Sequence, residues 1–539
     1  VSGGTTLLLT SDSELGGTSG GLTLGDASTG GVLKLGASFN LAGTRAFALG
    51  AGGGTINTNG FGTSVSQAIS GSGGLTKAGT GTLTLSAANT YTGTTTISGG
   101  TLTLSGSGSI AASSNVVDNA TLDITSNGAS IKSLSGSGSV SAAGKTLNIT
   151  NGNASDNFSG VISGTGANLE VSGGTAQLSG TNTYTGSTTI DATATLALSG
   201  TGSISLSSGV ADNGTFDISA LTNGGTSITT LSGSGDVILG GNTLTLTAAS
   251  STFSGVISGT GGLTIAGGTE TLTGTNTYTG DTTIDTGATL VLTGTGSLSS
   301  GSTLVIQSGG TFDTSGSSAT STLGALSGSG NMVLGSGGLE LTGGTGTYTG
   351  VLSGTGGLTI DDGVDQTLTG VNTYTGATII EEGGSLSLTG SGSIADSSGV
   401  QDDGTFDISG LTNGGTSITS LSGSGNIELG SNTLTLTNAS GTFSGVISDP
   451  AGGSLVVASG TEILTGDNTY TGGTTINSGA TLQLGNGGAG GSLVGDVTDN
   501  GHFTFDRSNA YTFAGTISGT GVVVQNGSGT LTLTGANSY

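Results

Sequence analysis

Short alternations of apolar residues with threonine or serine recur along the whole chain. Residues 101–104 read Thr-Leu-Thr-Leu, and similar stretches occupy residues 94–97, 121–124, 145–150, 168–171 and 175–178. A period of two is typical of a β-strand with one buried and one exposed face. Glycine, asparagine and aspartate interrupt the stretches, and no segment of useful length has the 3.6-residue period of a helix. The pattern predicts an all-β protein built from many short strands.

A longer repeat organises these stretches into blocks. The phrase Asn-Thr-Tyr-Thr-Gly begins at residues 89, 182, 276, 372 and 468, at spacings of 93, 94, 96 and 96. Two further markers keep step with it: an aromatic residue before Ser/Thr-Gly at Phe158, Phe253, Tyr348 and Phe443, and an aspartate at Asp123, Asp217, Asp313 and Asp407. Three markers in phase indicate a superrepeat of about 95 residues.

The strand pattern and the superrepeat together predict the fold. Three strands and about 24 residues per coil would place roughly four coils in each superrepeat and roughly 22 in the chain. This is the length scale of a right-handed parallel β-helix, in which every second side chain points inward. We therefore predict one continuous β-solenoid over residues 1–539, with a first block at 1–88, four tandem superrepeats at 89–467 and a degenerate last block at 468–539.

Composition supports this interpretation and removes several functions. Glycine accounts for 114 of 539 residues, and aromatic residues for only 4%, so a broad globular core cannot be filled. Six lysines and arginines stand against 32 acidic residues, and none lies between residues 146 and 506. Nucleic-acid binding is excluded, because it needs basic side chains against phosphates. No run of 18 apolar residues is present, so we expect no membrane-spanning helix.

One stretch of the chain is similar to a known repeat. Residues 73–85, with the sequence Gly-Gly-Leu-Thr-Lys-Ala-Gly-Thr-Gly-Thr-Leu-Thr-Leu, continue through 89–93 to 97–102 in a pattern that resembles the autotransporter-associated β-strand repeat. Similar sequences recur around Thr181, Thr275, Val371 and Asp467, and in degenerate form over 519–539. The resemblance implies a β-helical stalk on the surface of a Gram-negative bacterium, secreted by the type V route and commonly an adhesin or biofilm component.

The two ends of the chain carry pieces of the same motif. Residues 536–539 correspond to 88–91, and residues 1–5 correspond to 97–101. Two interpretations stay open: the sequence is an excerpt from a longer array, or copies stack head to tail into a filament, because an open strand edge can pair with another chain.

Residues able to carry catalysis are scarce. His502 is the only histidine, so any Ser-His-carboxylate set would depend on it alone. Acidic doublets stand at residues 361–362, 381–382 and 402–403, each in a single superrepeat and within the stretch that lacks cations. Glycoside cleavage needs two carboxylates at a set separation. Because each doublet occurs only once and no cation in this stretch could polarise a substrate, we interpret the doublets as solvated turns and expect no catalytic residues.

A second set of acids could bind a metal ion. Asp118, Asp212, Asp402, Asp403 and Asp499 lie at equivalent turns and offer the oxygen ligands that calcium prefers. The equivalent turn after Ile306 has no acid, and no Gly-Gly-x-Gly-x-Asp repeat is present. We therefore expect no cofactor, with calcium at these aspartates as the alternative.

The recurring tyrosines are the remaining candidates for contact with a partner. Five occupy the same place in successive superrepeats: Tyr91, Tyr184, Tyr278, Tyr374 and Tyr470. They could stack against sugars as surface aromatics, or pack over the edge of a coil with the hydroxyl in water.

The function predicted from these features is structural. We expect a non-enzymatic extracellular shaft or filament of a bacterial cell surface that mediates adhesion, aggregation or matrix formation. Its partners would be its own copies, other cells, or extracellular matrix and polysaccharide. The alternative is a carbohydrate-binding or carbohydrate-cleaving β-helix, which a groove lined by converging carboxylates and tyrosines would favour.

Overall fold

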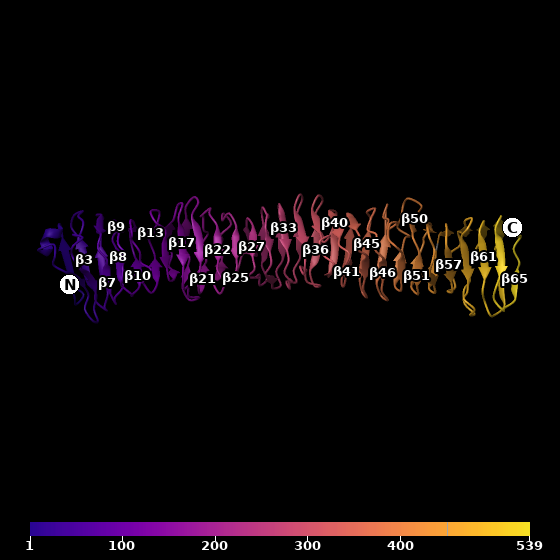
Figure 1. Cartoon of the computed structure of the whole chain (residues 1–539), viewed down its shortest axis with the longest axis horizontal. Helices are drawn as coiled ribbons and strands as arrows, with labels where there is room; N and C mark the ends of the chain where they lie inside the picture. The colour runs from indigo at the N-terminus through magenta and orange to yellow at the C-terminus, as the bar shows by residue number, and fades with distance from the viewer. Residues whose placement is uncertain (450) are drawn as a thin grey trace. The chain divides into compact units, whose positions relative to one another are not determined.

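The computed structural model describes residues 1–449 and 451–539 and confirms the all-β solenoid. The chain forms two compact units, residues 1–263 and 264–539, and in each of them short parallel strands stack side by side (Figure 1). A single 3-10 turn, η1 (Asp12–Leu15), is the only helical element of the described residues. No helix among the described residues is long and apolar enough to cross a membrane.

Each coil contributes strands to three faces. In unit 1, β10 (Thr95–Ile97) pairs with β12 (Val116–Asp118), β11 (Thr101–Leu104) pairs with β13 (Thr121–Asp123), and β14 (Ala129–Ile131) pairs with β17 (Thr146–Ile149). The same order recurs in unit 2, where β46 (Thr378–Ile380) pairs with β48 (Val400–Asp402), and β47 (Ser385–Leu388) with β49 (Thr405–Asp407). The strands are short because a corner interrupts the chain after every few residues.

The coils are tighter than the sequence pattern suggested. Register partners in the regular coils lie about 19 to 22 residues apart, so the chain winds about 25 turns rather than roughly 22. In unit 2, the equivalent strands β34 (Thr282–Ile284), β46 and β58 (Thr474–Ile476) belong to three different sheets. One superrepeat therefore contains about four and two-thirds coils instead of four, and each copy begins two-thirds of a turn, or two faces, further round.

Glycine explains how so short a coil can close. Gly423 has a φ of 113°, and a Cβ at this position would lie 2.0 Å from the carbonyl oxygen of Asp402 on the preceding coil. Only glycine combines this backbone conformation with such a close approach of two corners. Equivalent corners at Gly136, Gly233, Gly328 and Gly519 have the same geometry.

The interior is built from ladders of aliphatic side chains. Leu83, Leu102 and Leu122 are register partners on three successive coils, and all are fully buried. Threonines flank them on the outer face, as the alternating pattern predicts. Burial of each leucine contributes about 1.5–3 kcal/mol, so stability accumulates coil by coil.

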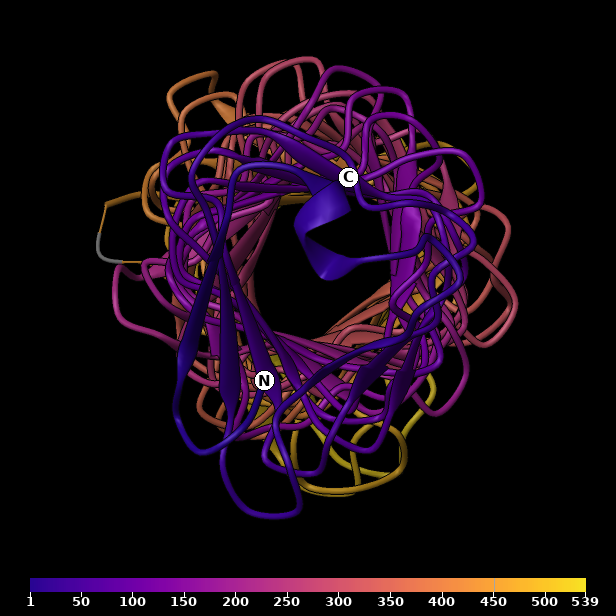
Figure 2. The same ribbon diagram turned by 90° about the vertical axis from the view of Figure 1, so that its left-hand side faces the viewer.

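The first coils of unit 1 hold η1 across one end of the interior, seen end-on in Figure 2. Arg45 is 1% exposed, and its guanidinium forms an ion pair with Asp12 at 3.0 Å and donates to the carbonyl of Gly20 at 2.9 Å. This bonding fixes η1 over the apolar side chains of the first coils.

Candidate functional site

The asparagine of the Asn-Thr-Tyr-Thr-Gly phrase links neighbouring coils through hydrogen bonds of its buried side chain. The side-chain oxygen of Asn372 accepts the N–H of Leu352 at 2.9 Å, and its Nδ2 donates to the carbonyls of Gly370 at 3.0 Å and Ser393 at 3.1 Å. Asn89, Asn182 and Asn468 make the same three kinds of contact. The most conspicuous repeat in the sequence is thus a structural bridge.

The recurring tyrosines are also interior, so their proposed role as surface-contact aromatics is wrong. Tyr91, Tyr184, Tyr278, Tyr374 and Tyr470 are all at most 1% exposed. The hydroxyl of Tyr374 lies 2.7 Å from Oγ1 of Thr378, which lies 3.0 Å from Oγ of Ser397. The hydroxyl is not in water either, and burial raises the pKa of the phenol. A threonine four residues after every one of these tyrosines was the signal that could have revealed the partner.

Four of the five calcium candidates point into the core, which corrects their placement at exposed turns. Asp118, Asp212, Asp402 and Asp499 are fully buried, because the strand continues through them and the chain turns only afterwards. Asp403 alone faces outward, where it accepts hydrogen bonds from Gln401 and Ser424. In the ranges 1–449 and 451–539, no group of three or more His, Asp or Glu side chains could hold a metal ion.

Burial changes the ionisation of these interior acids. It raises the pKa of Asp118 to about 6 and those of Asp212 and Asp402 to about 7, and it also raises the pKa of Asp499. Desolvation is the largest cause at all four positions, since a carboxylate loses its hydration inside the coil.

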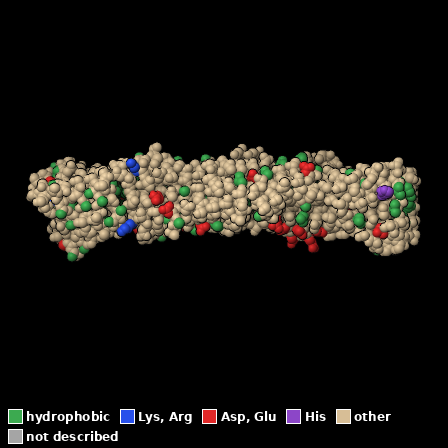
Figure 3. Space-filling view, viewed as in Figure 1, with side chains coloured by type: hydrophobic (Ala, Val, Ile, Leu, Met, Phe, Trp, Pro, Cys, Tyr) green, Lys and Arg blue, Asp and Glu red, His purple; other side chains and the backbone are tan. Residues whose placement is uncertain are grey.

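The acidic doublets come together in space, which the sequence did not show. Ile360, Ile380 and Asp402 are register partners on three coils, so the following residues Asp361, Glu381 and Asp403 form an acidic column on the outer surface. Figure 3 shows acidic side chains gathered at one edge of unit 2. His502 is exposed on β61 (His502–Phe505), and the residues next to it in the sheet are Thr481 and Val522.

Three shallow grooves lie at equivalent positions, two in unit 1 and one in unit 2. Each has a volume of about 400 Å³ and borders the first strand of a sheet: β14, β26 (Gly225–Ile228) or β50 (Gly415–Ile418). The first groove is lined by residues 106–109, 127–130, Thr146, Asn148 and Glu170, the second by Ser203, Ser205, residues 223–227, Thr243 and Thr245, and the third by Ser393, residues 413–417, Thr433 and Thr435.

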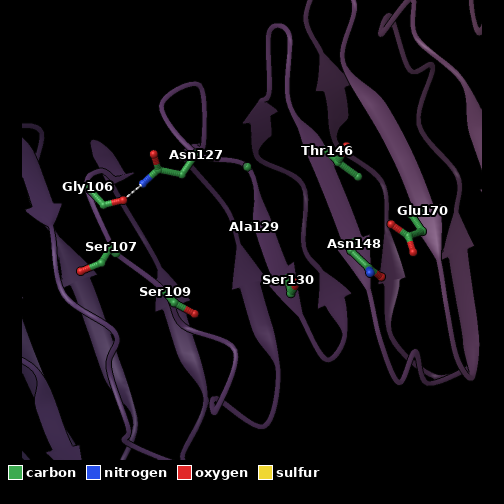
Figure 4. A pocket seen from close by; sticks show the side chains of 11 residues that line it. Gly106, Ser107, Ser109, Asn127, Ala129, Ser130, Thr146, Asn148 and Glu170 are labelled. Atoms are coloured by element: carbon green, nitrogen blue, oxygen red, sulfur yellow. Dashed lines mark hydrogen bonds between the residues drawn. The ribbon is translucent and has the colours of Figure 1, made fainter.

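A protruding Asn-Gly turn forms one wall of each groove. In the first groove, Nδ2 of Asn127 donates to the carbonyl of Gly106 and braces the turn against the preceding coil (Figure 4). In the third, Gly414 and Gly415 have φ values of 90° and 140°, a conformation that suits glycine. The floor consists of outward hydroxyls and amides, with Glu170 as the single charged group in the three linings.

The chemistry of the grooves is that of neutral hydrogen bonding. Hydroxyl and amide groups can both donate and accept, whereas nucleophilic or acid–base catalysis would need paired titratable groups, which these linings lack. Sequence reasoning missed the grooves, although the phrase Asn-Gly-Gly-Thr-Ser-Ile occurs at both 223–228 and 413–418.

Comparison with known proteins confirms the resemblance to autotransporter repeats. Six segments match the family described as Passenger-associated-transport-repeat: residues 75–104, 172–198, 267–292, 365–392, 459–484 and 523–539. Together they cover less than a third of the chain. A stretch of 46 residues is 48% identical to the protein named Adhesin BmaC autotransporter of Brucella suis biovar 1 (strain 1330), over 8% of this chain and only 1% of that protein. No solved structure matches the chain.

Proposed function

We propose that this chain, with its six passenger-associated transport repeats, belongs to the surface-exposed β-helical passenger of a Gram-negative bacterium and acts in adhesion without catalysis. The observation that carries the proposal is the recurrence of a similar groove, lined mainly by hydroxyl and amide groups, at equivalent positions. The partial similarity to an autotransporter adhesin supports the same function.

Several grooves on one chain can compensate for the weakness of each single contact. A groove lined by hydroxyls and amides offers a few hydrogen bonds in competition with water, each with a net value of only about 1 kcal/mol. Several such grooves on one chain convert weak contacts into avidity, because the second contact becomes intramolecular once the first has formed. The partners proposed are copies of the chain, other cells, and extracellular matrix or polysaccharide.

Binding of a neutral polysaccharide is the second candidate function. The density of hydroxyl and amide groups in the groove linings favours it, since such groups pair with sugar hydroxyls. Cleavage of the polysaccharide is disfavoured, because Glu170 is the only carboxylate among the three linings and the recurring tyrosines are buried.

Filling the grooves tests the proposal. The triple variant Ser130→Arg, Ser227→Arg, Ser417→Arg places a bulky side chain in each groove. A matched control carries Thr84→Arg on β9 (Thr82–Leu85), and Thr283→Arg and Thr475→Arg at outward positions of two Thr-Thr-Ile strands. Beads coated with each form of the full chain are scored for adhesion to one another and to cells.

We expect the groove variant to lose most adhesion and the control to retain it. Equal adhesion of both variants would show that the grooves are not the contact surface. Pull-down with neutral polysaccharides separates the two candidates, because loss of polysaccharide binding in the groove variant alone would support the second.

A further inference from the structure

Four aspartates enter the interior at equivalent places in the superrepeat. They are the last residues of β12, β24 (Val210–Asp212), β48 and β60 (Val497–Asp499), and each is fully buried. On the coil before, each aspartate has an isoleucine as its register partner: Ile97, Ile190, Ile380 or Ile476. On the coil after, the chain turns through a glycine corner. The carboxyls therefore stand within the aliphatic ladders.

Only one oxygen of each carboxyl is satisfied. In Asp402, Oδ1 accepts the N–H of Gly404 at 3.2 Å, and Oδ2 is buried without a hydrogen-bond partner. The other three repeat this arrangement, with Oδ1 accepting the N–H two residues ahead at 2.9–3.1 Å. A carboxylate in this position would leave a buried charge uncompensated, whereas the neutral acid leaves only a hydroxyl unpaired.

The charged neighbours do not supply a counter-charge within the core. Asp236 lies near Asp212 and Asp403 lies near Asp402, and both disfavour ionisation of the buried group. His502 lies near Asp499 and favours ionisation there, but less strongly than burial opposes it. For Asp118, burial is the largest influence and raises the pKa, and backbone hydrogen bonds lower it. The buried Lys77 lies two coils before Asp118, beyond Ile97, and its Nζ donates to the carbonyls of Ala78, Gly79 and Gly99.

Another acid is buried in the same way, at a different place in the superrepeat. Glu462, on β57 (Thr461–Leu464), is fully buried with Leu482 as its register partner, and burial raises its pKa to about 8. The equivalent residues of the two superrepeats before it are Gln366 and Glu270, which are also buried. The chain thus uses both an acid and its neutral isostere at this buried position.

We propose that the solenoid folds with these five carboxyls protonated, and that it is therefore a pH-responsive structure whose coils tighten in mildly acidic surroundings and loosen as the pH rises. The responsive groups are Asp118, Asp212, Asp402, Asp499 and Glu462.

The direction of the effect follows from proton linkage. Below about pH 4, folded and unfolded chains both hold the protons, and the stability contribution of the five groups is complete. Between about pH 4 and pH 7, the unfolded chain releases protons that the folded chain retains, so stability falls as pH rises. Each group changes the local opening equilibrium by about tenfold per pH unit between its pKa in the unfolded chain and its higher pKa in the folded chain.

The chain offers a matched control for general charge repulsion. Asp123, Asp217, Asp313 and Asp407 stand on the outer face, and each also accepts the N–H two residues ahead through Oδ1. They differ from the interior set in burial. Either set of substitutions replaces four acids by neutral amides. A general effect of the formal net charge of −26 would therefore not depend on burial, whereas the proposal predicts a changed pH response only in the interior variant.

The experiment compares three forms of the full chain: the natural sequence, an interior variant with Asp118→Asn, Asp212→Asn, Asp402→Asn and Asp499→Asn, and a control with Asp123→Asn, Asp217→Asn, Asp313→Asn and Asp407→Asn. Amide exchange protection factors, corrected for intrinsic exchange, are measured over β24 and β48 at about pH 5 and about pH 8 in high salt, which screens surface charge.

We expect protection in the natural chain to fall by more than tenfold from the lower to the higher pH, with the same fall in the control and little change in the interior variant. An equal fall in all three forms would overturn the proposal.

Infrared spectra of the natural chain give an independent measurement that needs no variant to fold. A protonated carboxyl band that persists at about pH 6.5, where exposed acids are ionised, is expected. Absence of that band would overturn the proposal even if the interior variant fails to fold.

Discussion

The third superrepeat (276–371) and the fourth (372–467) have the same backbone plan but differ in their interior. Both contain the chain of buried hydroxyls, formed by Tyr278, Thr282 and Ser302 in the third and by its counterpart at Tyr374 in the fourth. Where the fourth has Asp402, however, the third has Ile306, and both side chains are fully buried. The coil therefore requires an inward side chain at this place but not an acid.

The outer surfaces of the two superrepeats differ as well. The fourth carries the Asn413-Gly414-Gly415 turn and its groove, whereas the third reaches β38 (Ser321–Leu323) through residues 314–320, which contain no residue with positive φ. The acidic column, which runs from Asp361 at the end of the third superrepeat to Asp403 in the fourth, has no counterpart at Asp285, because Asp285 lies beside the neutral Gln307. Interior ladders and hydroxyl chains maintain the coil, and the residues between them are free to vary.

The largest expected effect comes from giving the third superrepeat the acid of the fourth. Ile306→Asp removes a buried aliphatic side chain and adds a carboxyl that resists ionisation. We expect the local free energy of opening to fall by about 4 kcal/mol at pH 8, and by clearly less at pH 5. Amide exchange over β36 (Thr303–Ile306) measures it. Gln307→Asp, at an exposed neighbouring position, should have little effect at either pH.

A smaller effect should be common to both superrepeats. Asn372→Ala would leave the N–H of Leu352 and the carbonyls of Gly370 and Ser393 without this partner inside the coil. Because unsatisfied buried groups are costly, we expect a loss of about 2–3 kcal/mol in local opening free energy, and a similar loss for Asn276→Ala. Exchange protection of the adjoining strands is the measurement. A loss confined to one superrepeat would contradict the shared role of the amide, and exposed Asn331→Ala is the control.

The buried hydroxyl chains should contribute less than the amides. Tyr374→Phe keeps the ring in place and removes the hydroxyl bonded to Thr378, whose Oγ1 retains Ser397 as a partner. A loss of about 1 kcal/mol is expected, with an equal loss for Tyr278→Phe. Thermal unfolding followed by circular dichroism measures both. A much larger loss would show that the ring, and not only the hydroxyl, had moved.

The fold class could be predicted well from the sequence, because inward aliphatic residues alternate with outward polar residues in every coil. The number of residues per coil was overestimated, since it depends on corners such as Gly423, where two backbones approach closely. Four whole coils per superrepeat would return each copy to the same face, whereas the equivalent strands β34, β46 and β58 lie in three different sheets.

Prediction of the candidate sites failed for a related reason. An aspartate before an asparagine is typical of a turn, yet Asp212 ends a strand and points inward. The grooves depend on residues that lie about 20 positions apart in sequence and become neighbours only once the register of the coils is known. The sequence shows where the hydroxyl-rich segments are, but it does not show which of them lie side by side on neighbouring coils.

The smallest expected effect sharpens the comparison at the surface. In the fourth superrepeat, Glu381 lies between Asp361 and Asp403 on neighbouring coils, and like charges in register repel one another. Glu381→Gln should raise the midpoint of thermal unfolding by about 1 °C or less at low ionic strength, and added salt should abolish the gain because exposed charges are screened within about 10 Å. Asp285→Asn in the third superrepeat, with Gln307 beside it, should produce no gain at either ionic strength. An equal, salt-independent gain in both variants would mean that the substitution acts through the strand itself and not through the acidic column.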